Sequence, residues 1–160
     1  MTINIQKTDV NAIVPTRGSA CAAGYDLYAM TEYDERIIPH GETAKIGTGI
    51  KMEIPDGYFG AIFARSGLAT KQGLRPANCV GVVDSDYRGE IIVAIHNDSH
   101  ETRTVKRGDR IAQIVIMPYL SVDSFVEVDS MEATERGDGG FGSTGVSLTD
   151  DMCDGQMTLF

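Results

Sequence analysis

A chain of 160 residues suffices for one domain that buries a substantial core without disulfides or structural metals. The net charge of −9 argues against broad nucleic-acid binding, because an acidic surface repels a polyanion. No run of about 18 apolar residues is present, and the N-terminus lacks the apolar segment of a signal peptide, so we expect a cytosolic protein without a membrane span.

Short apolar runs separated by turn residues fill the first half of the chain. Ile3 and Ile5 alternate with polar residues and predict a first strand. Further strands are expected over residues 36–38, 43–46, 49–54 and 58–64. Because 18 glycines and these short runs suit frequent turns, the pattern favours an all-β barrel or sandwich with at most one short helix.

Polar groups interrupt this pattern at two places. Asp26, in the stretch AGYDLYA (23–29), breaks a strand-like run and by itself is most simply a turn residue. Arg65 and Ser66 follow the strand expected over 58–64. Ser66 is suited to capping a short helical turn whose N–H groups face an anion, and Arg65 supplies a planar cation that matches phosphate oxygens. A surface Arg and a capping Ser without a ligand are the alternative.

The stretch NCVGVVDSDYRG (78–89) combines a strand pattern with a polar corner. Cys79 lies in its apolar part and is expected in the core, and the chain leaves the corner as the apolar run 91–95. With Asp, Ser and Gly between the two runs, the pattern predicts a β-hairpin. Asp84 and Tyr87 at its tip would offer a base for water and a flat ring for a nucleotide, although an ordinary polar turn has the same composition.

The second half of the chain continues the strand pattern and then changes composition. Strands are expected over 102–105, 110–117 and 125–128. Gln113 interrupts an apolar run, so it is either a hydrogen-bond hub of the core or a ligand contact. Residues 136–145 contain five glycines with an Arg, a Phe and two hydroxyl side chains. This composition suits a lid over phosphates and a base, and a flexible tail is the alternative.

Five stretches, in this order and spacing, resemble the five motifs of the homotrimeric dUTPase family: AGYDLYA (23–29), ARSGLA (64–69), NCVGVVDSDYRG (78–89), GDRIAQ (108–113) and RGDGGFGSTG (136–145). The resemblance covers nearly everything from residue 20 to residue 145. The chain departs from the family pattern in two respects. Ala64 replaces a proline before Arg-Ser-Gly, which should loosen the turn slightly, and the chain extends beyond Gly145.

The resemblance implies an all-β subunit, a jelly-roll-like barrel of the β-clip type with a flexible C-terminal arm. It divides the chain into a barrel core (1–130), a glycine-rich lid (131–145) and a tail (146–160). It also implies a homotrimer with three active sites, each at a subunit interface. One chain supplies the 78–89 stretch, a second chain the second and fourth motifs, and the third chain the glycine-rich segment.

By the same resemblance, the reaction is hydrolysis of dUTP to dUMP and pyrophosphate by water attack on the α-phosphorus, with Mg²⁺ as cofactor. Asp84 is the expected general base, and Asp26 is expected to hold the metal through water. The expected substrate-binding residues are Arg65, Ser66, Gly67, Asn78, Gly81, Val83, Tyr87, Gln113, Arg136, Phe141, Gly142, Ser143 and Thr144. A dCTP deaminase of the same fold is an alternative, which Tyr87 and the glycine-rich motif disfavour; a non-catalytic protein that responds to nucleotides is another.

The chain ends in a short apolar peptide that the enzyme does not require. Gln156, Met157, Thr158, Leu159 and Phe160 look like the Gln-Leu-x-Leu-Phe peptide with which replication proteins dock on the bacterial sliding clamp. Met157 replaces Leu, a swap of similar volume. Acidic residues before this peptide would act as a spacer. An apolar terminus that folds back on its own trimer is the alternative.

Overall fold

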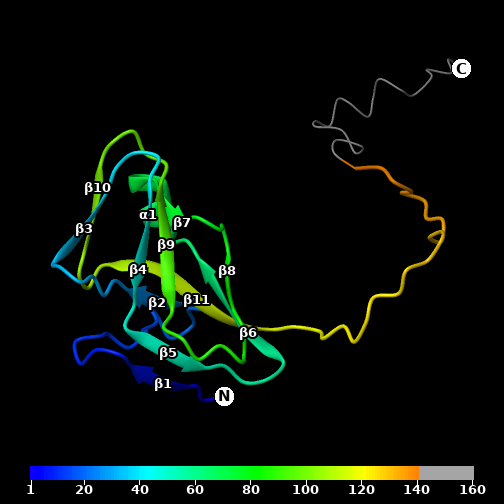
Figure 1. Ribbon diagram of the computed structural model, residues 1–160, viewed down its shortest axis with the longest axis horizontal. Coiled ribbons are helices and arrows are strands. Elements are labelled where there is room, and N and C mark those ends of the chain that lie inside the picture. Colours follow the sequence, from blue (N-terminus) through cyan, green and yellow to red (C-terminus); the bar gives the residue numbers. More distant parts are fainter. Residues whose placement is uncertain (141–160) are drawn as a thin grey trace, which may run out of the picture. The chain divides into compact units, whose positions relative to one another are not determined.

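The structure, a computed structural model, describes residues 1–140. Met1–Ser121 form one compact unit, and residues 122–140 belong to a second. The first unit is mostly β, as predicted (Figure 1). Its elements are β1 (Asn4–Lys7), β2 (Tyr25–Tyr28), β3 (Glu35–Ile38), β4 (Thr43–Gly47), β5 (Ile50–Glu53), β6 (Tyr58–Phe63), α1 (Ser66–Gln72), β7 (Leu74–Pro76), β8 (Gly81–Val83), β9 (Ile92–Asn97), β10 (Arg103–Lys106) and β11 (Arg110–Pro118).

Antiparallel pairing arranges these strands in two larger and two smaller sheets. The larger sheets have the orders β2-β11-β6-β8 and β4-β9-β7, and the smaller ones pair β1 with β5 and β3 with β10. Figure 1 shows β3 and β10 at one end of the first unit and β1 and β5 at the other. Buried aliphatic residues alternate with more exposed ones along β4 and β9, as expected for strands with one face on a core. This jelly-roll-like architecture confirms the predicted fold class.

The apolar core draws side chains from both larger sheets. Leu27 and Ile114 come from the four-stranded sheet, Ile95 comes from the three-stranded sheet, and none of the three is more than 1% exposed. Fully burying one such side chain stabilises a fold by about 1.5–3 kcal/mol. The core therefore holds the two larger sheets, and the loops that connect them, in fixed positions.

The short helix α1 begins one residue earlier than it would if Ser66 were its N-cap. Ser66 is its first residue, and Arg65 occupies the N-cap position with φ −84° and ψ 126°. Arg65 O accepts the N–H groups of Leu68 and Ala69, each at 3.0 Å, and no side chain caps the helix. The predicted N-cap role of Ser66 is therefore wrong. Across residues 1–140, no helix has both the length and the apolar character that a membrane crossing needs.

The predicted β-hairpin is wrong as well. β8 pairs with β6 in the four-stranded sheet, whereas β9 pairs with β4 and β7 in the other larger sheet. Residues 84–90, here called the crossover loop, therefore pass from one sheet to the other. Val83 and Ile91 flank this loop and are buried, at 8% and 2% exposure. Each run sends a side chain into the core, but each finds its backbone partner elsewhere.

Two further expectations fail at exposed positions. Cys79 is exposed with φ +61°, because residues 77–80 turn the chain between β7 and β8. Residues 125–128 form no strand, and Phe125 and Val126 are 93% and 79% exposed. Their alternating pattern has no partner strand in the sheets of residues 1–140. A period-2 pattern does not make a strand without a neighbour to receive its hydrogen bonds.

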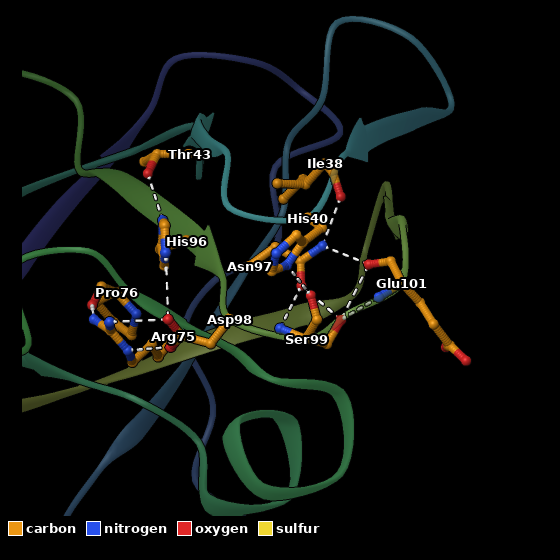
Figure 2. A network of polar contacts seen from close by, with 10 residues as sticks. All are labelled: Ile38, His40, Thr43, Arg75, Pro76, His96, Asn97, Asp98, Ser99 and Glu101. Atoms are coloured by element: carbon orange, nitrogen blue, oxygen red, sulfur yellow. Dashed lines mark hydrogen bonds and ion pairs between the residues drawn. The ribbon is translucent and has the colours of Figure 1, made fainter.

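The three histidines match no catalytic spacing in the sequence, and the structure assigns His96 to a polar network at strand ends (Figure 2). Thr43 Oγ1 lies 2.9 Å from His96 Nδ1, and Asp98 Oδ1 lies 3.3 Å from His96 Nε2. Asp98 Oδ2 accepts a hydrogen bond from Arg75 Nε at 2.5 Å, which raises the pKa of the Arg75 guanidinium. These contacts join the ends of β4, β7 and β9, so the network fits a structural role.

Candidate active site

A small hollow lies beside β8, which is the outermost strand of the four-stranded sheet. β6 pairs with one side of β8, from Ile62↔Gly81 to Gly60↔Val83. An edge strand presents main-chain N–H and C=O groups along its other side, where a flat polar ligand can pair with them. The hollow has a volume of about 210 Å³, and its lining includes the predicted site residues Asn78, Gly81, Val83, Asp84 and Tyr87.

The crossover loop presents Asp84 and Tyr87 at this hollow. The Tyr87 N–H donates to Asp84 O at 3.2 Å, and the Tyr87 hydroxyl donates to Glu90 O at 2.9 Å. The ring also lies against Gly89, where any Cβ atom would overlap the Tyr87 hydroxyl. Asp84 is exposed, so water can reach its carboxylate. The loop thus holds a fixed ring beside a solvent-accessible acid.

A second group of predicted residues gathers at the other edge of the same sheet. Asp26 on β2 is only 9% exposed, and its two carboxylate oxygens face two cations. Arg65 Nε donates to Oδ1 at 2.8 Å, and an Nη atom of Arg110 donates to Oδ2 at 3.3 Å. Arg110 was not among the predicted site residues, although it lies within the GDRIAQ stretch. Asp26 therefore orients two guanidinium groups, which are suited to phosphate oxygens.

Gln113 ties this cation cluster to the start of α1. Its Nε2 donates to Ala64 O at 3.0 Å, and on β11 it pairs in register with both Asp26 and Phe63. The hydrogen bond fixes the residue that replaces the family's proline. Ser66 and Gly67 are exposed at the first turn of α1, directly after Arg65. We call Asp26, Arg65, Ser66, Gly67, Arg110 and Gln113 the cation cluster.

The cation cluster and Asp84 are far apart within one chain. Gln113 on β11 pairs with Asp26 on one side and with Phe63 of β6 on the other, so Asp26 and Phe63 lie at the same level of the sheet. Asp84 follows Val83, which pairs with Gly60 of β6. The offset is about four residues, or roughly 13 Å along the strands, together with three strand spacings, or roughly 14 Å across them. The two groups are therefore on the order of 20 Å apart, and the bonds to Asp26 direct Arg65 away from β8.

The glycine-rich segment is described only in part. In the second unit, Arg136 is exposed and its Nε donates to Gly139 O at 3.0 Å. The predicted ligand residues Phe141, Gly142, Ser143 and Thr144 lie outside the described residues. So does the terminal peptide of Gln156, Met157, Thr158, Leu159 and Phe160. Their roles stay predictions from the sequence.

Comparison with known proteins decides the family. The family model for dUTPase matches residues 10–145, which include all five motifs. The chain belongs to the dUTPase family. Its dUTPase relatives include the deoxyuridine 5'-triphosphate nucleotidohydrolase of Desulfitobacterium hafniense, 51% identical over 135 residues that cover 84% of this chain and 88% of the relative. The enzyme of the same name from Saccharomyces cerevisiae is 43% identical over 143 residues, covering 89% of this chain and 94% of the relative.

A solved dUTPase structure matches the fold as well. The dUTPase of Staphylococcus bacteriophage 80alpha, solved with dUPNHPP, superposes with a TM-score of 0.78 at 29% identity. The match covers 91% of this chain and 99% of the phage protein. The match to the dUTPase family model ends at residue 145, so residues 146–160 extend beyond that match.

Proposed function

We propose that this protein hydrolyses dUTP to dUMP and pyrophosphate, which keeps uracil out of DNA and supplies dUMP for dTMP synthesis. One observation carries the proposal: Asp84 and Tyr87 line a hollow beside the unpaired side of β8. This hollow combines the Asp84 carboxylate as a base, the Tyr87 ring as a contact for the sugar, and a row of main-chain donors and acceptors. The family membership and the named relatives support the same reaction.

Asp84 acts as the general base in this proposal. Its exposed carboxylate takes a proton from the water that attacks the α-phosphorus, and pyrophosphate leaves. The carboxylate follows directly on a strand anchored by the buried Val83, so its position is set by the sheet. A base on a rigid element contributes by orientation as well as by proton transfer.

The cation cluster binds the triphosphate. Arg65 and Gln113 hold phosphate oxygens, and Ser66 and Gly67 lie near the reacting phosphate. Arg110 joins this set because it shares the Asp26 carboxylate with Arg65. Paired guanidinium groups with fixed geometry explain how a chain of net charge −9 can bind a polyanion at one place.

The Asp26 carboxylate is compatible with a magnesium ion only through water. Each of its oxygens already accepts one guanidinium N–H, which leaves acceptor capacity for a metal-bound water. Among residues 1–140, no group of three His, Cys, Asp or Glu side chains is placed to hold a metal ion. The ion would therefore bind mainly to the triphosphate, where Mg²⁺ offsets the charge that develops on the leaving pyrophosphate.

Base selection follows from the open side of β8. Main-chain groups of Gly81 and Val83, together with the Asn78 amide, pair with the uracil edge in the proposed complex. Cytosine presents its donors and acceptors in the opposite order, which would leave polar groups unpaired. Tyr87 packs under the sugar and leaves no room for a ribose 2′-hydroxyl. Thymine is excluded by close approach of the backbone to its C5 methyl group.

The active enzyme is a homotrimer with shared sites in this proposal. The roughly 20 Å between Asp84 and the cation cluster prevents one chain from holding both around a single α-phosphate. A neighbouring subunit that brings its own cation cluster to the hollow removes this difficulty. Arg136, Phe141, Gly142, Ser143 and Thr144 of the third subunit would then close over the γ-phosphate and the uracil ring.

The cytoplasm is the proposed compartment. Cys21 and Cys79 are unpaired and exposed in the described part of the chain, a condition that persists in a reducing environment. Docking of the terminal peptide on a bacterial sliding clamp stays a prediction from five residues.

Pyrophosphate release measured across dUTP, dCTP, dTTP and UTP tests the proposed function. We expect release from dUTP with strong preference over the other three. Release of ammonia from dCTP would instead identify a deaminase. Nucleotide binding without any product would indicate the non-catalytic alternative.

A further inference from the structure

The position of the Tyr87 hydroxyl group depends on Glu90, the last residue of the crossover loop. That hydroxyl donates to the main-chain oxygen of Glu90 at 2.9 Å. Tyr87 is 45% exposed, so packing alone does not fix the ring. The position of the ring therefore depends on where the Glu90 carbonyl is held.

The Glu90 carboxylate anchors this carbonyl to a different part of the chain. Its Oε1 accepts the Gly49 N–H at 2.8 Å, and its Oε2 lies 3.4 Å from Thr8 Oγ1. The carboxylate fits closely against β4, because a Cβ atom on Gly47 would lie 2.5 Å from Oε1. Glu90 is half-buried, which strengthens such a charge-assisted hydrogen bond relative to an exposed one.

The segment that receives the carboxylate is itself rigid. Ile91 N–H donates to Ile50 O at 2.9 Å, and Thr48 donates to Ile91 O through its hydroxyl at 2.8 Å. Ile50 is fully buried and Thr48 is 1% exposed. The chain around Glu90 is thus attached to the core on its C-terminal side, through the peptide group that contains the Glu90 carbonyl, and the carboxylate adds a second attachment.

We propose that Glu90 is a positioning residue for sugar selection. Its carboxylate, held by the Gly49 N–H, fixes the carbonyl that orients the Tyr87 hydroxyl, and so sets how closely the ring approaches the 2′ position of the nucleotide. This inference rests on the proposed function. It adds a residue that acts through Tyr87 and that the motif pattern did not single out.

The test compares kcat/KM for dUTP and for UTP in the full-length protein and its variants. In Glu90→Ala, kcat/KM for dUTP divided by kcat/KM for UTP should fall by about tenfold or more. The reason is that a Tyr87 ring displaced by a fraction of an ångström admits the extra hydroxyl of the ribose. Glu90→Gln should keep the ratio within about twofold, because its amide oxygen still accepts the Gly49 N–H. The ratio does not depend on the fraction of folded enzyme, so a purely structural loss would leave it unchanged.

Two further variants complete the design. Glu53→Ala is the matched control, since the Glu53 carboxylate also accepts a side-chain hydrogen bond, from Asn4 at 2.8 Å, but on β5 away from the hollow. Its ratio should equal that of the wild type. Gly47→Ala displaces the Glu90 carboxylate without altering Glu90, and it should reproduce the lowered ratio even if Glu90→Ala does not fold.

The outcomes separate this inference from the proposed function. An unchanged ratio in Glu90→Ala or Gly47→Ala, with a wild type that prefers dUTP, would overturn the positioning role alone. An equal fall in Glu90→Gln would also overturn it, because the hydrogen bond would then not be the cause. A wild type that does not hydrolyse dUTP would overturn the proposed function, and this inference with it.

Discussion

At the scale of single residues, Asp84 carries the one proton transfer of the proposed reaction. Asp84→Asn keeps the size and removes the basic carboxylate. We expect kcat to fall by about 10²–10⁴, with dUTP binding retained, because a general base contributes on this scale. Steady-state kinetics and equilibrium binding of a non-hydrolysable dUTP analogue measure the two effects. Asp56→Asn, at an exposed turn, is the control and should behave as the wild type. Near-normal turnover in Asp84→Asn would remove this residue from the mechanism.

Asp26 is a second residue with a separable role. Asp26→Asn removes the charged partner of Arg65 and Arg110, and hydrogen bonds to charged groups contribute about 1.5–3 kcal/mol each. We therefore expect kcat/KM for dUTP to fall by about 10–100-fold. Asp98→Asn breaks a comparable ion pair with Arg75 at an exposed site and should leave kcat/KM unchanged. Equal effects of the two substitutions on kcat/KM would contradict the orienting role of Asp26.

At the scale of elements, the sequence predicts strands better than it predicts their partners. Most expected strands are present within a residue or two, because alternating aliphatic residues and turn residues are local signals. The crossover loop shows the limit. The sequence pattern of two apolar runs around a polar turn predicts a hairpin, yet β8 and β9 belong to different sheets. Pairing depends on which edge each strand meets in the folded chain, and that information is not local.

For the candidate site too, the sequence predicted some of the residues and missed others. The resemblance identified Asp84, Tyr87, Arg65 and Gln113 from their motifs, and the structure brings the members of each group together. Arg110 and Glu90 were missed, because their contacts join residues 84 and 41 positions apart in the sequence. Such long-range hydrogen bonds leave no trace in spacing or periodicity. The roles of the predicted residues stay predictions until variants are measured.

The glycine-rich segment is an element whose removal should separate activity from stability. Residues 122–140 are almost entirely exposed, and the core lies within Met1–Ser121. A chain that ends at Glu135 should therefore melt within a few degrees of the full-length protein but lose nearly all dUTP turnover, since Arg136 and Phe141 are absent. A chain that ends at Gly145 is the control and should stay active. Retained turnover in the shorter chain would exclude a role for this segment.

The terminal peptide is a further element with its own test. Titration of a bacterial sliding clamp with the full-length protein should give saturable binding, and a chain that ends at Gly155 should not bind. Both forms should hydrolyse dUTP equally, because residues 156–160 lie beyond the dUTPase match. Equal affinity of the two forms, or no binding by either, would end the sliding-clamp hypothesis.

At the scale of the whole molecule, the central claim is that no chain holds a complete site. Asp84 and the cation cluster lie roughly 20 Å apart in one chain, and in the proposed trimer two subunits contribute them to one site. Symmetric assembly of identical chains supplies this arrangement three times in a trimer.

Mixing two inactive variants tests this claim most directly. We expect Asp84→Asn and Arg65→Ala chains to be nearly inactive alone but to carry complementary halves of the site. After subunit exchange, confirmed by mass spectrometry, random 1:1 mixing places an intact Asp84 and an intact Arg65 at one interface about a quarter of the time. We expect dUTP turnover to recover toward about a quarter of the wild-type value. Turnover that stays at the average of the two parent variants, despite complete exchange, would contradict the shared site.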